Sequence, residues 1–283
     1  MTGTIQRGDG SATTLTRLII AWAITIPLAI SPNVVGSGTP SPARWALFVA
    51  LLSLAGLPFV WTAARSLRTY AGMLALLTLL AVFLENALPA WASGQPWFPD
   101  PSGYPAAFIL QSPKVVAAFV MMTVLTLLGY RRREFFLPSV LPRKVWIGLG
   151  VGAAVVMGST LLLHMKSASL AGSEGAAGAA RYLPLALVLA AMNSFAEEML
   201  YRGVLLGPLL RQITANQAIS MTAVLFGVAH FHGTPSGFPG MGLTFIAGWI
   251  FGWAMVETRG ISLPWFLHFV PDAVIFVASA LPR

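Results

Sequence analysis

Nine apolar stretches dominate this sequence, and most of them are long enough to cross a lipid bilayer. A helix that crosses a bilayer needs about 20 predominantly apolar residues, with a range of roughly 17–25. Only helices and closed barrels satisfy their backbone hydrogen bonds in lipid, so such runs predict a helix bundle. The first and eighth stretches are short, so we expect an all-α, polytopic membrane protein with eight or nine spans: Leu18–Ile30, Trp45–Ala63, Tyr70–Leu88, Ala106–Tyr130, Val145–Leu163, Tyr182–Leu206, Ala215–Phe231, Leu243–Val256 and Ile261–Leu281.

The composition excludes several classes of protein. Hydrophobic residues make up 57% of the chain and charged residues 9%, whereas soluble domains carry about 25% charged residues. The absence of cysteine rules out disulfides, thiolate catalysis and thiolate metal sites. The net charge of +8 comes from basic residues in short loops between apolar stretches. That pattern is typical of membrane topology, so we predict a lipid environment and no nucleic-acid partner.

The charge of the loops predicts how the chain is oriented. Cytoplasmic loops of membrane proteins carry an excess of Lys and Arg. With a cytoplasmic N-terminus, eleven basic residues fall in inner segments: Arg7, Arg17, Arg65, Arg68, Arg131, Arg132, Arg133, Arg143, Lys144, Arg211 and Arg259. The outer segments hold only four: Arg44, Lys166, Arg181 and Arg283. We therefore predict an integral, multi-pass membrane protein with its N-terminus in the cytoplasm.

Polar and charged residues inside the apolar stretches concentrate in the last third of the chain. We therefore predict that residues 1–140 are N-terminal scaffold helices and that residues 141–283 form a catalytic transmembrane core. No clear internal repeat is present, which argues against a transporter built from inverted repeats. The pairs Gly148-x-x-x-Gly152 and Gly248-x-x-x-Gly252 are typical of close helix contacts in membranes.

Two adjacent carboxylates, Glu197 and Glu198, stand in the apolar stretch 182–206. A charged side chain at the bilayer centre costs roughly 2.5–3.5 kcal/mol on insertion scales, and such residues mark functional sites. Four-residue spacing allows Glu198 to form an ion pair with Arg202. Glu197 lies on another face, with Asn193 and Tyr201, and is a candidate general base. The alternative is a structural charge cluster that locks helices together.

Two further motifs supply partners from other apolar stretches. Phe226 and His230 lie one helical turn apart, so the phenylalanine could wall a pocket that the imidazole enters. His268 and Asp272 have the same spacing, and Pro271 removes a backbone donor beside them, which favours a cavity. Taken alone, His230 could be an interfacial residue, and the His268–Asp272 pair could hold two helices together.

The depths of these groups agree only in part. At 1.5 Å per residue, Glu197 lies about 13 Å and His268 about 10 Å from the inner membrane face. By the same count, His230 lies near the far end of its stretch. A helix that begins inside the membrane, or one that tilts, would bring His230 to the same depth.

The three motifs together, E-E-x-x-x-R, F-x-x-x-H and H-x-x-x-[ND], resemble those of the CPBP family of intramembrane proteases. This family includes the eukaryotic CAAX prenyl endopeptidase and many bacterial relatives, some linked to bacteriocin immunity. The resemblance covers roughly residues 185–275 and suggests a bacterial inner membrane as the location. The third motif ends in Asp272, where many members have asparagine.

The resemblance implies roles for the residues that match. Glu197 and His230 would activate a water molecule, and His268 with Asp272 would stabilise the oxyanion of the tetrahedral intermediate. Glu198, Arg202 and Phe226 would support them. The implied substrate is a membrane-anchored or lipid-modified protein or peptide. We expect no cofactor and no metal, although Glu197, His230 and His268 could form a three-ligand zinc site with an open position for water.

Two other functions remain open at this stage. Glu197 and the histidines could form the proton relay of a proton-coupled membrane transporter. The chain could also be a membrane immunity or binding protein without catalytic activity. Replacing Glu197 by glutamine would leave such a binding protein working and would abolish an endopeptidase.

Overall fold

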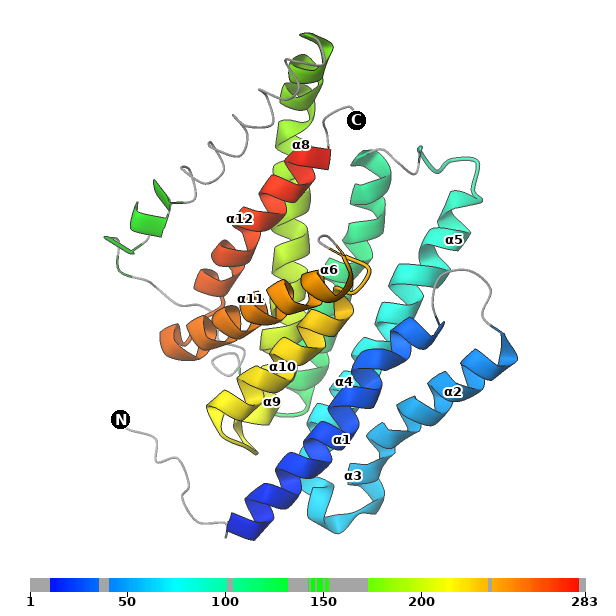
Figure 1. Cartoon of the computed structure of the whole chain (residues 1–283), viewed down its shortest axis with the longest axis vertical. Coiled ribbons are helices and arrows are strands. Elements are labelled where there is room, and N and C mark those ends of the chain that lie inside the picture. The colour runs from blue at the N-terminus through cyan, green and yellow to red at the C-terminus, as the bar shows by residue number, and fades with distance from the viewer. Residues whose placement is uncertain are drawn as a thin grey trace.

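The computed structural model describes residues 11–35, 41–100, 104–131, 142, 144–145, 147–149, 151–152, 173–233 and 236–279. Within these ranges all regular structure is helical, as the sequence predicts. Helices of the two halves of the chain lie against one another, α1 beside α10 and α6 beside α8, and α10 and α11 are inclined to α8 (Figure 1).

The N-terminal half contains six α-helices and three short helical segments. Ser41 starts α2, because its Oγ accepts a hydrogen bond from the Arg44 amide at 3.4 Å and Pro42 suits the first helical position. The Thr25 hydroxyl joins α1 to α4 through a 2.6 Å hydrogen bond with the Tyr70 hydroxyl. The elements are α1 (Ser11–Val35), α2 (Pro42–Ser53), η1 (Leu54–Gly56), α3 (Leu57–Val60), η2 (Thr62–Leu67), α4 (Arg68–Val82), η3 (Phe83–Ala87), α5 (Leu88–Ser93) and α6 (Tyr104–Leu127).

The C-terminal half holds the three motifs. Thr214 and Gln217 form a capping box that starts α10, and α11 ends where Arg259 takes a left-handed φ of 52°. A π-helical segment, η5, follows Glu198 directly, and such segments are frequent at functional sites. The elements are α8 (Ser173–Glu198), η5 (Met199–Leu206), α9 (Gly207–Leu210), α10 (Ala215–Ala229), α11 (Gly237–Thr258) and α12 (Ser262–Ser279).

The two halves share one hydrophobic core. Helix α6 packs against α8 and η5, α1 packs against α10, and α4 packs against η5. Many large apolar side chains nevertheless lie on the outside, including Val60, Leu127 and Phe238. An apolar exterior of this kind suits a protein whose surroundings are lipid.

Five helical segments are long and apolar enough to cross a membrane: Thr14–Val35, Pro42–Val60, Pro105–Leu127, Leu183–Leu210 and Gly237–Thr258. Two more, Ala215–Ala229 and Ser262–Val277, are apolar but shorter. The chain is therefore a multi-pass membrane protein, although the described residues do not confirm eight or nine spans. The predicted span Val145–Leu163 lies mostly outside the described residues, which include only 145, 147–149 and 151–152 of it.

Candidate functional site

A fully buried ion pair anchors the site. Arg202 Nη1 donates to Glu198 Oε1 at 2.8 Å, which confirms the pairing predicted from their four-residue spacing. Arg202 Nη2 donates to the Gly248 carbonyl at 3.3 Å, and the guanidinium lies over the Phe226 ring at 4.4 Å from its centroid. Burial of both charges is costly unless each has further partners, and Arg202 has these on α10 and α11.

Glycines allow α11 to approach this ion pair. A Cβ on Gly248 would lie 3.0 Å from Phe226 Cδ1 and 3.2 Å from Arg202 Nη2, and one on Gly252 would lie 3.1 Å from Ile219 Cγ2. The predicted close contact of Gly248-x-x-x-Gly252 is thus confirmed. The Gly148-x-x-x-Gly152 prediction is not, because a Cβ on either glycine would meet no described atom within 4 Å.

Glu197 lies where the three motifs meet. Its Oε2 is 3.6 Å from His230 Nε2 and 3.7 Å from His268 Nε2. Its Oε1 faces the other way, 3.9 Å from Lys114 Nζ on α6. Oε2 is buried and accepts no hydrogen bond from any described residue. The two carboxylates therefore differ: Glu198 is held by direct hydrogen bonds, and Glu197 has one oxygen unbonded beside two imidazoles.

His230 caps the C-terminus of α10. Its Nδ1 donates to the Phe226 carbonyl at 2.8 Å, so the neutral ring keeps the Nε2 lone pair toward Glu197. The Phe226 ring lies against the imidazole, 4.4 Å between centroids. With 15 residues, α10 is about 22 Å long. This length is short of a full span and α10 is inclined to α8 (Figure 1), and the end of α10 brings His230 to within 3.6 Å of Glu197.

His268 connects all the acidic groups of the site. Its Nδ1 donates to Glu198 Oε1 at 2.8 Å, and its Nε2 lies 3.6 Å from Asp272 Oδ1. The Phe251 ring stacks on the imidazole at 5.2 Å between centroids. Asp272 Oδ2 in turn accepts a hydrogen bond from Asn193 Nδ2 at 3.0 Å. This chain of contacts fixes the plane of the His268 ring.

The structure also brings in residues that sequence reasoning did not assign to the site. Asn193 was placed on the face of Glu197, but its partner on α12 was not predicted. Neither Lys114 nor Phe251 is among the predicted site residues. The sequence could have identified Lys114, because a lysine within a membrane span is unusual. No feature of the sequence distinguishes Phe251 from other apolar residues.

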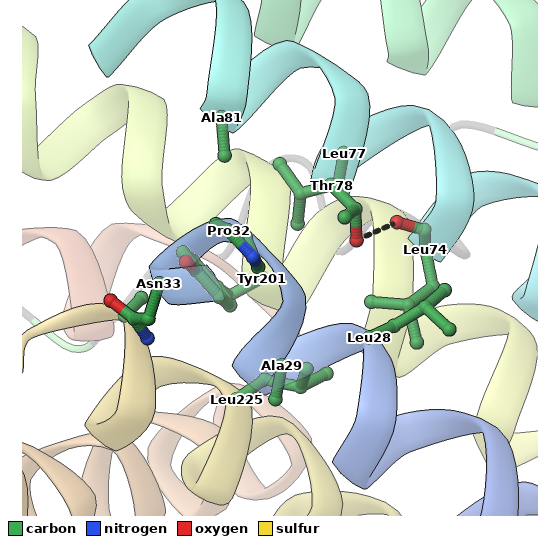
Figure 2. Close-up of a pocket in the computed structure, with 11 residues that line it drawn as sticks. Leu28, Ala29, Pro32, Asn33, Leu74, Leu77, Thr78, Ala81, Tyr201 and Leu225 are labelled. Atoms are coloured by element: carbon green, nitrogen blue, oxygen red, sulfur yellow. Dashed lines mark hydrogen bonds between the residues drawn. The ribbon is translucent and has the colours of Figure 1, made fainter. Parts of the chain in front are cut away.

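Two pockets share part of their lining, namely Leu77, Ala81 and Tyr201. Figure 2 shows the first, between α1, α4, η5 and α10: Leu28, Ala29, Pro32, Asn33, Leu74, Leu77, Thr78, Ala81, Tyr201, Leu225 and Ala229. The second pocket reaches Glu197, the candidate general base. Its lining residues are Leu77, Leu80, Ala81, Leu84, Lys114, Ala117, Glu197, Leu200 and Tyr201. Most of the residues that line the two pockets are apolar.

In chemical terms, the site offers an unbonded carboxylate oxygen, two imidazole nitrogens beside it and a second carboxylate that orients one imidazole. These are the components of general acid–base catalysis. Among the described residues, no group of three or more His, Cys, Asp or Glu side chains is arranged to hold a metal ion.

Residues 179–274 match the model of one protein family, described as Rce1-like, type II CAAX prenyl endopeptidase. The matched segment contains every residue of the three motifs, and Lys114 lies outside it. No curated protein and no solved structure matches the chain.

Proposed function

Because residues 179–274 form a domain of the Rce1-like family of type II CAAX prenyl endopeptidases, we propose that the chain is an intramembrane endopeptidase. It hydrolyses a peptide bond in a membrane-anchored or lipid-modified protein substrate. One observation carries this proposal: Glu197 Oε2 faces the Nε2 atoms of His230 and His268, each from a separate helix, at 3.6 and 3.7 Å.

Glu197 and His230 activate the water in this proposal. A water molecule within hydrogen-bond distance donates one hydrogen to Glu197 Oε2 and the other to His230 Nε2, whose lone pair is free because Nδ1 donates to the Phe226 carbonyl. The water oxygen attacks the scissile carbonyl carbon, and Glu197 takes the proton. Glu197 then passes this proton to the leaving nitrogen as the carbon–nitrogen bond breaks, which gives an amine and a carboxylic acid, and the acid releases the second water proton to solvent as it becomes a carboxylate.

His268 and Asp272 act on the negative charge that develops on the carbonyl oxygen. Since His268 Nδ1 donates to Glu198, the imidazolium form carries a second N–H on Nε2 that can donate to the oxyanion. An ionised Asp272, 3.6 Å from Nε2, orients this group, and a protonated Asp272 donates a hydrogen bond of its own. Glu198, Arg202 and Phe226 hold the two imidazoles in place.

We propose that this reaction uses no metal ion. The H-E-x-x-H spacing that is usual in zinc proteases is absent from the sequence, which supports a metal-free mechanism. If zinc were used, Glu197, His230 and His268 would hold it. Cleavage by enzyme dialysed against 1,10-phenanthroline should equal that of untreated enzyme. Loss of cleavage that added zinc restores would contradict the metal-free mechanism.

We also propose a bacterial inner membrane as the location, with a cytoplasmic N-terminus. The family resemblance supports the bacterial membrane, and loop charge supports the orientation. The start of α1, α3 and α9 lie toward one end of the molecule, and the start of α8 lies toward the other (Figure 1). Arg65 and Arg68 follow α3, and Arg211 follows α9, so these basic residues gather at the end assigned to the cytoplasm.

The test uses purified protein in liposomes and two internally quenched peptides. One peptide ends in a farnesylated cysteine followed by three residues, and the other lacks the farnesyl group. Wild-type protein should cut at least the first, and Glu197→Gln should reduce cleavage by roughly 10²-fold or more, the usual contribution of a general base. The matched control is Glu257→Gln, an exposed carboxylate near the end of α11.

The outcomes separate the proposals. Cleavage of the farnesylated peptide alone would identify a lipid-modified substrate, and equal cleavage of both would identify a membrane-anchored one without a prenyl requirement. A Glu197→Gln variant that cuts as fast as wild type would refute the mechanism. If wild-type protein cut neither peptide and left cellular membrane proteins uncut, the endopeptidase itself would be refuted in favour of a transport or binding role.

A further inference from the structure

We propose that Lys114, in the N-terminal half of the chain, is a positioning residue for Glu197 in the reaction proposed above. The inference rests on that proposed function. It assigns a role to a residue outside residues 179–274, the segment that matches the family. It also gives the N-terminal helices a part in the site, beyond that of a scaffold.

Lys114 lies well inside a membrane span. It is ten residues after Tyr104, the start of α6, which corresponds to about 15 Å along the helix. The surrounding segment, Pro105–Leu127, is one of the five that can cross a membrane. A lysine at this depth is costly, and such residues face a cavity or an oppositely charged partner rather than lipid.

Packing directs Lys114 toward the site. It begins a stripe at helical spacing whose other members are buried: Ala117, Ala118, Met121 and Leu125. Farther along α6, the Phe119 ring lies 5.7 Å from that of Phe195 on α8, and Phe195 is two residues before Glu197. Lys114 and Ala117 also line one pocket together with Glu197 and Leu200, and α6 packs against both α8 and η5, so the side of α6 that carries Lys114 faces the carboxylate.

The contact divides the two oxygens of Glu197 between different partners. Lys114 Nζ lies 3.9 Å from Oε1, whereas Oε2 faces the imidazoles of His230 and His268. Glu197 is thus the acidic partner of the Lys114 ammonium among the side chains that the structure describes. Attraction between the ammonium and Oε1 restricts rotation of the carboxylate, which keeps Oε2 directed at the water that the histidines orient.

The surroundings of Lys114 also limit the cost of placing an ammonium group in a membrane span. The side chain of Lys114 is 25% exposed and that of Glu197 is 12% exposed, and both line the pocket that reaches the site. A partly open position allows water to solvate the free donors of the ammonium. The opposite charge beside it offsets the cost of placing either group in the membrane.

The first experiment measures kcat and KM with the farnesylated quenched peptide. Lys114→Met removes the charge at similar volume and should lower kcat by roughly 10- to 100-fold, as for a misplaced catalytic group, with KM unchanged. Lys114→Arg keeps the charge and should restore most of kcat. Val116→Ala, on the exposed side of α6, is the matched control. A rise in KM at unchanged kcat would overturn positioning in favour of substrate binding, and an Arg variant as slow as Met would also overturn it.

A second experiment does not depend on cleavage. Melting temperatures are compared for Lys114→Met, Glu197→Gln and the double variant in one detergent. Residues in contact give non-additive effects, so the double variant should melt no lower than the less stable single variant. Additive losses would overturn the contact itself. If wild-type protein cuts neither peptide and leaves cellular membrane proteins uncut, the proposed function fails, and this cycle still decides whether Lys114 and Glu197 interact.

Discussion

Removal of the Arg202 guanidinium should expose how much the site depends on its buried ion pair. Both Glu198 and Arg202 are completely buried, and they are joined at 2.8 Å. The variant Arg202→Met keeps much of the volume that packs between Phe226 and Phe251. It leaves Glu198 with the Nδ1–H of His268 but without its positive partner.

The expected cost follows from this burial. Breaking a buried ion pair by removal of one partner destabilises a protein by about 3–5 kcal/mol, because an uncompensated charge is left inside. In chains of about this size, each kcal/mol lowers Tm by about 2–4 °C. The Arg202→Met variant should therefore melt about 6–20 °C below wild type, and peptide cleavage should fall as His268 loses its fixed orientation.

A second variant separates lost charge from lost packing. Glu198→Gln combined with Arg202→Met removes the stranded charge and keeps an oxygen that accepts from His268 Nδ1. Its Tm, measured by intrinsic fluorescence in the same detergent, should recover at least half of the loss. An Arg202→Met protein with the same Tm as wild type would refute the reasoning. So would a double variant that melts as low as the single one.

Two further variants test neighbouring contacts. Gly248→Ala places a Cβ 3.2 Å from Arg202 Nη2, so overpacking should destabilise the protein by about 1–3 kcal/mol. Gly242→Ala on the same helix meets open space and should have the melting temperature of wild type. Equal melting temperatures of the two variants would contradict this prediction. Asn193→Leu removes the donor to Asp272 Oδ2, which leaves a buried acceptor at a cost of about 1–3 kcal/mol. Its kcat should fall with KM unchanged, and a wild-type kcat would show that Asn193 does not support the site.

The class of fold was predictable because the physics that sets it is local. Long apolar runs must become helices in lipid, and the structure is helical in all the regular segments it describes. Depth was harder to predict, because it depends on where a helix begins and how it inclines. The short α10 (Ala215–Ala229) shows this, since a full perpendicular span would have placed His230 far from Glu197.

The contacts of the site also differ in how well the sequence predicts them. The Glu198–Arg202 pair follows from spacing within one helix, so the sequence was sufficient. The contacts of Lys114 with Glu197 and of Asn193 with Asp272 join residues that are 83 and 79 positions apart, respectively. Neither local spacing nor composition encodes such distant pairs. They depend on which face of α6 packs against α8, and in a span that is apolar all round, periodicity does not identify that face.

The central claim is that Glu197 makes this chain a protease, and protein termini in cells test it most directly. Termini of membrane proteins are compared between cells that carry wild-type protein and cells that carry Glu197→Gln at equal expression. The account predicts uncut precursors that accumulate only with the variant, and their sequences would identify the substrate. Identical termini in the two strains, with the variant still correcting any deletion phenotype, would contradict it.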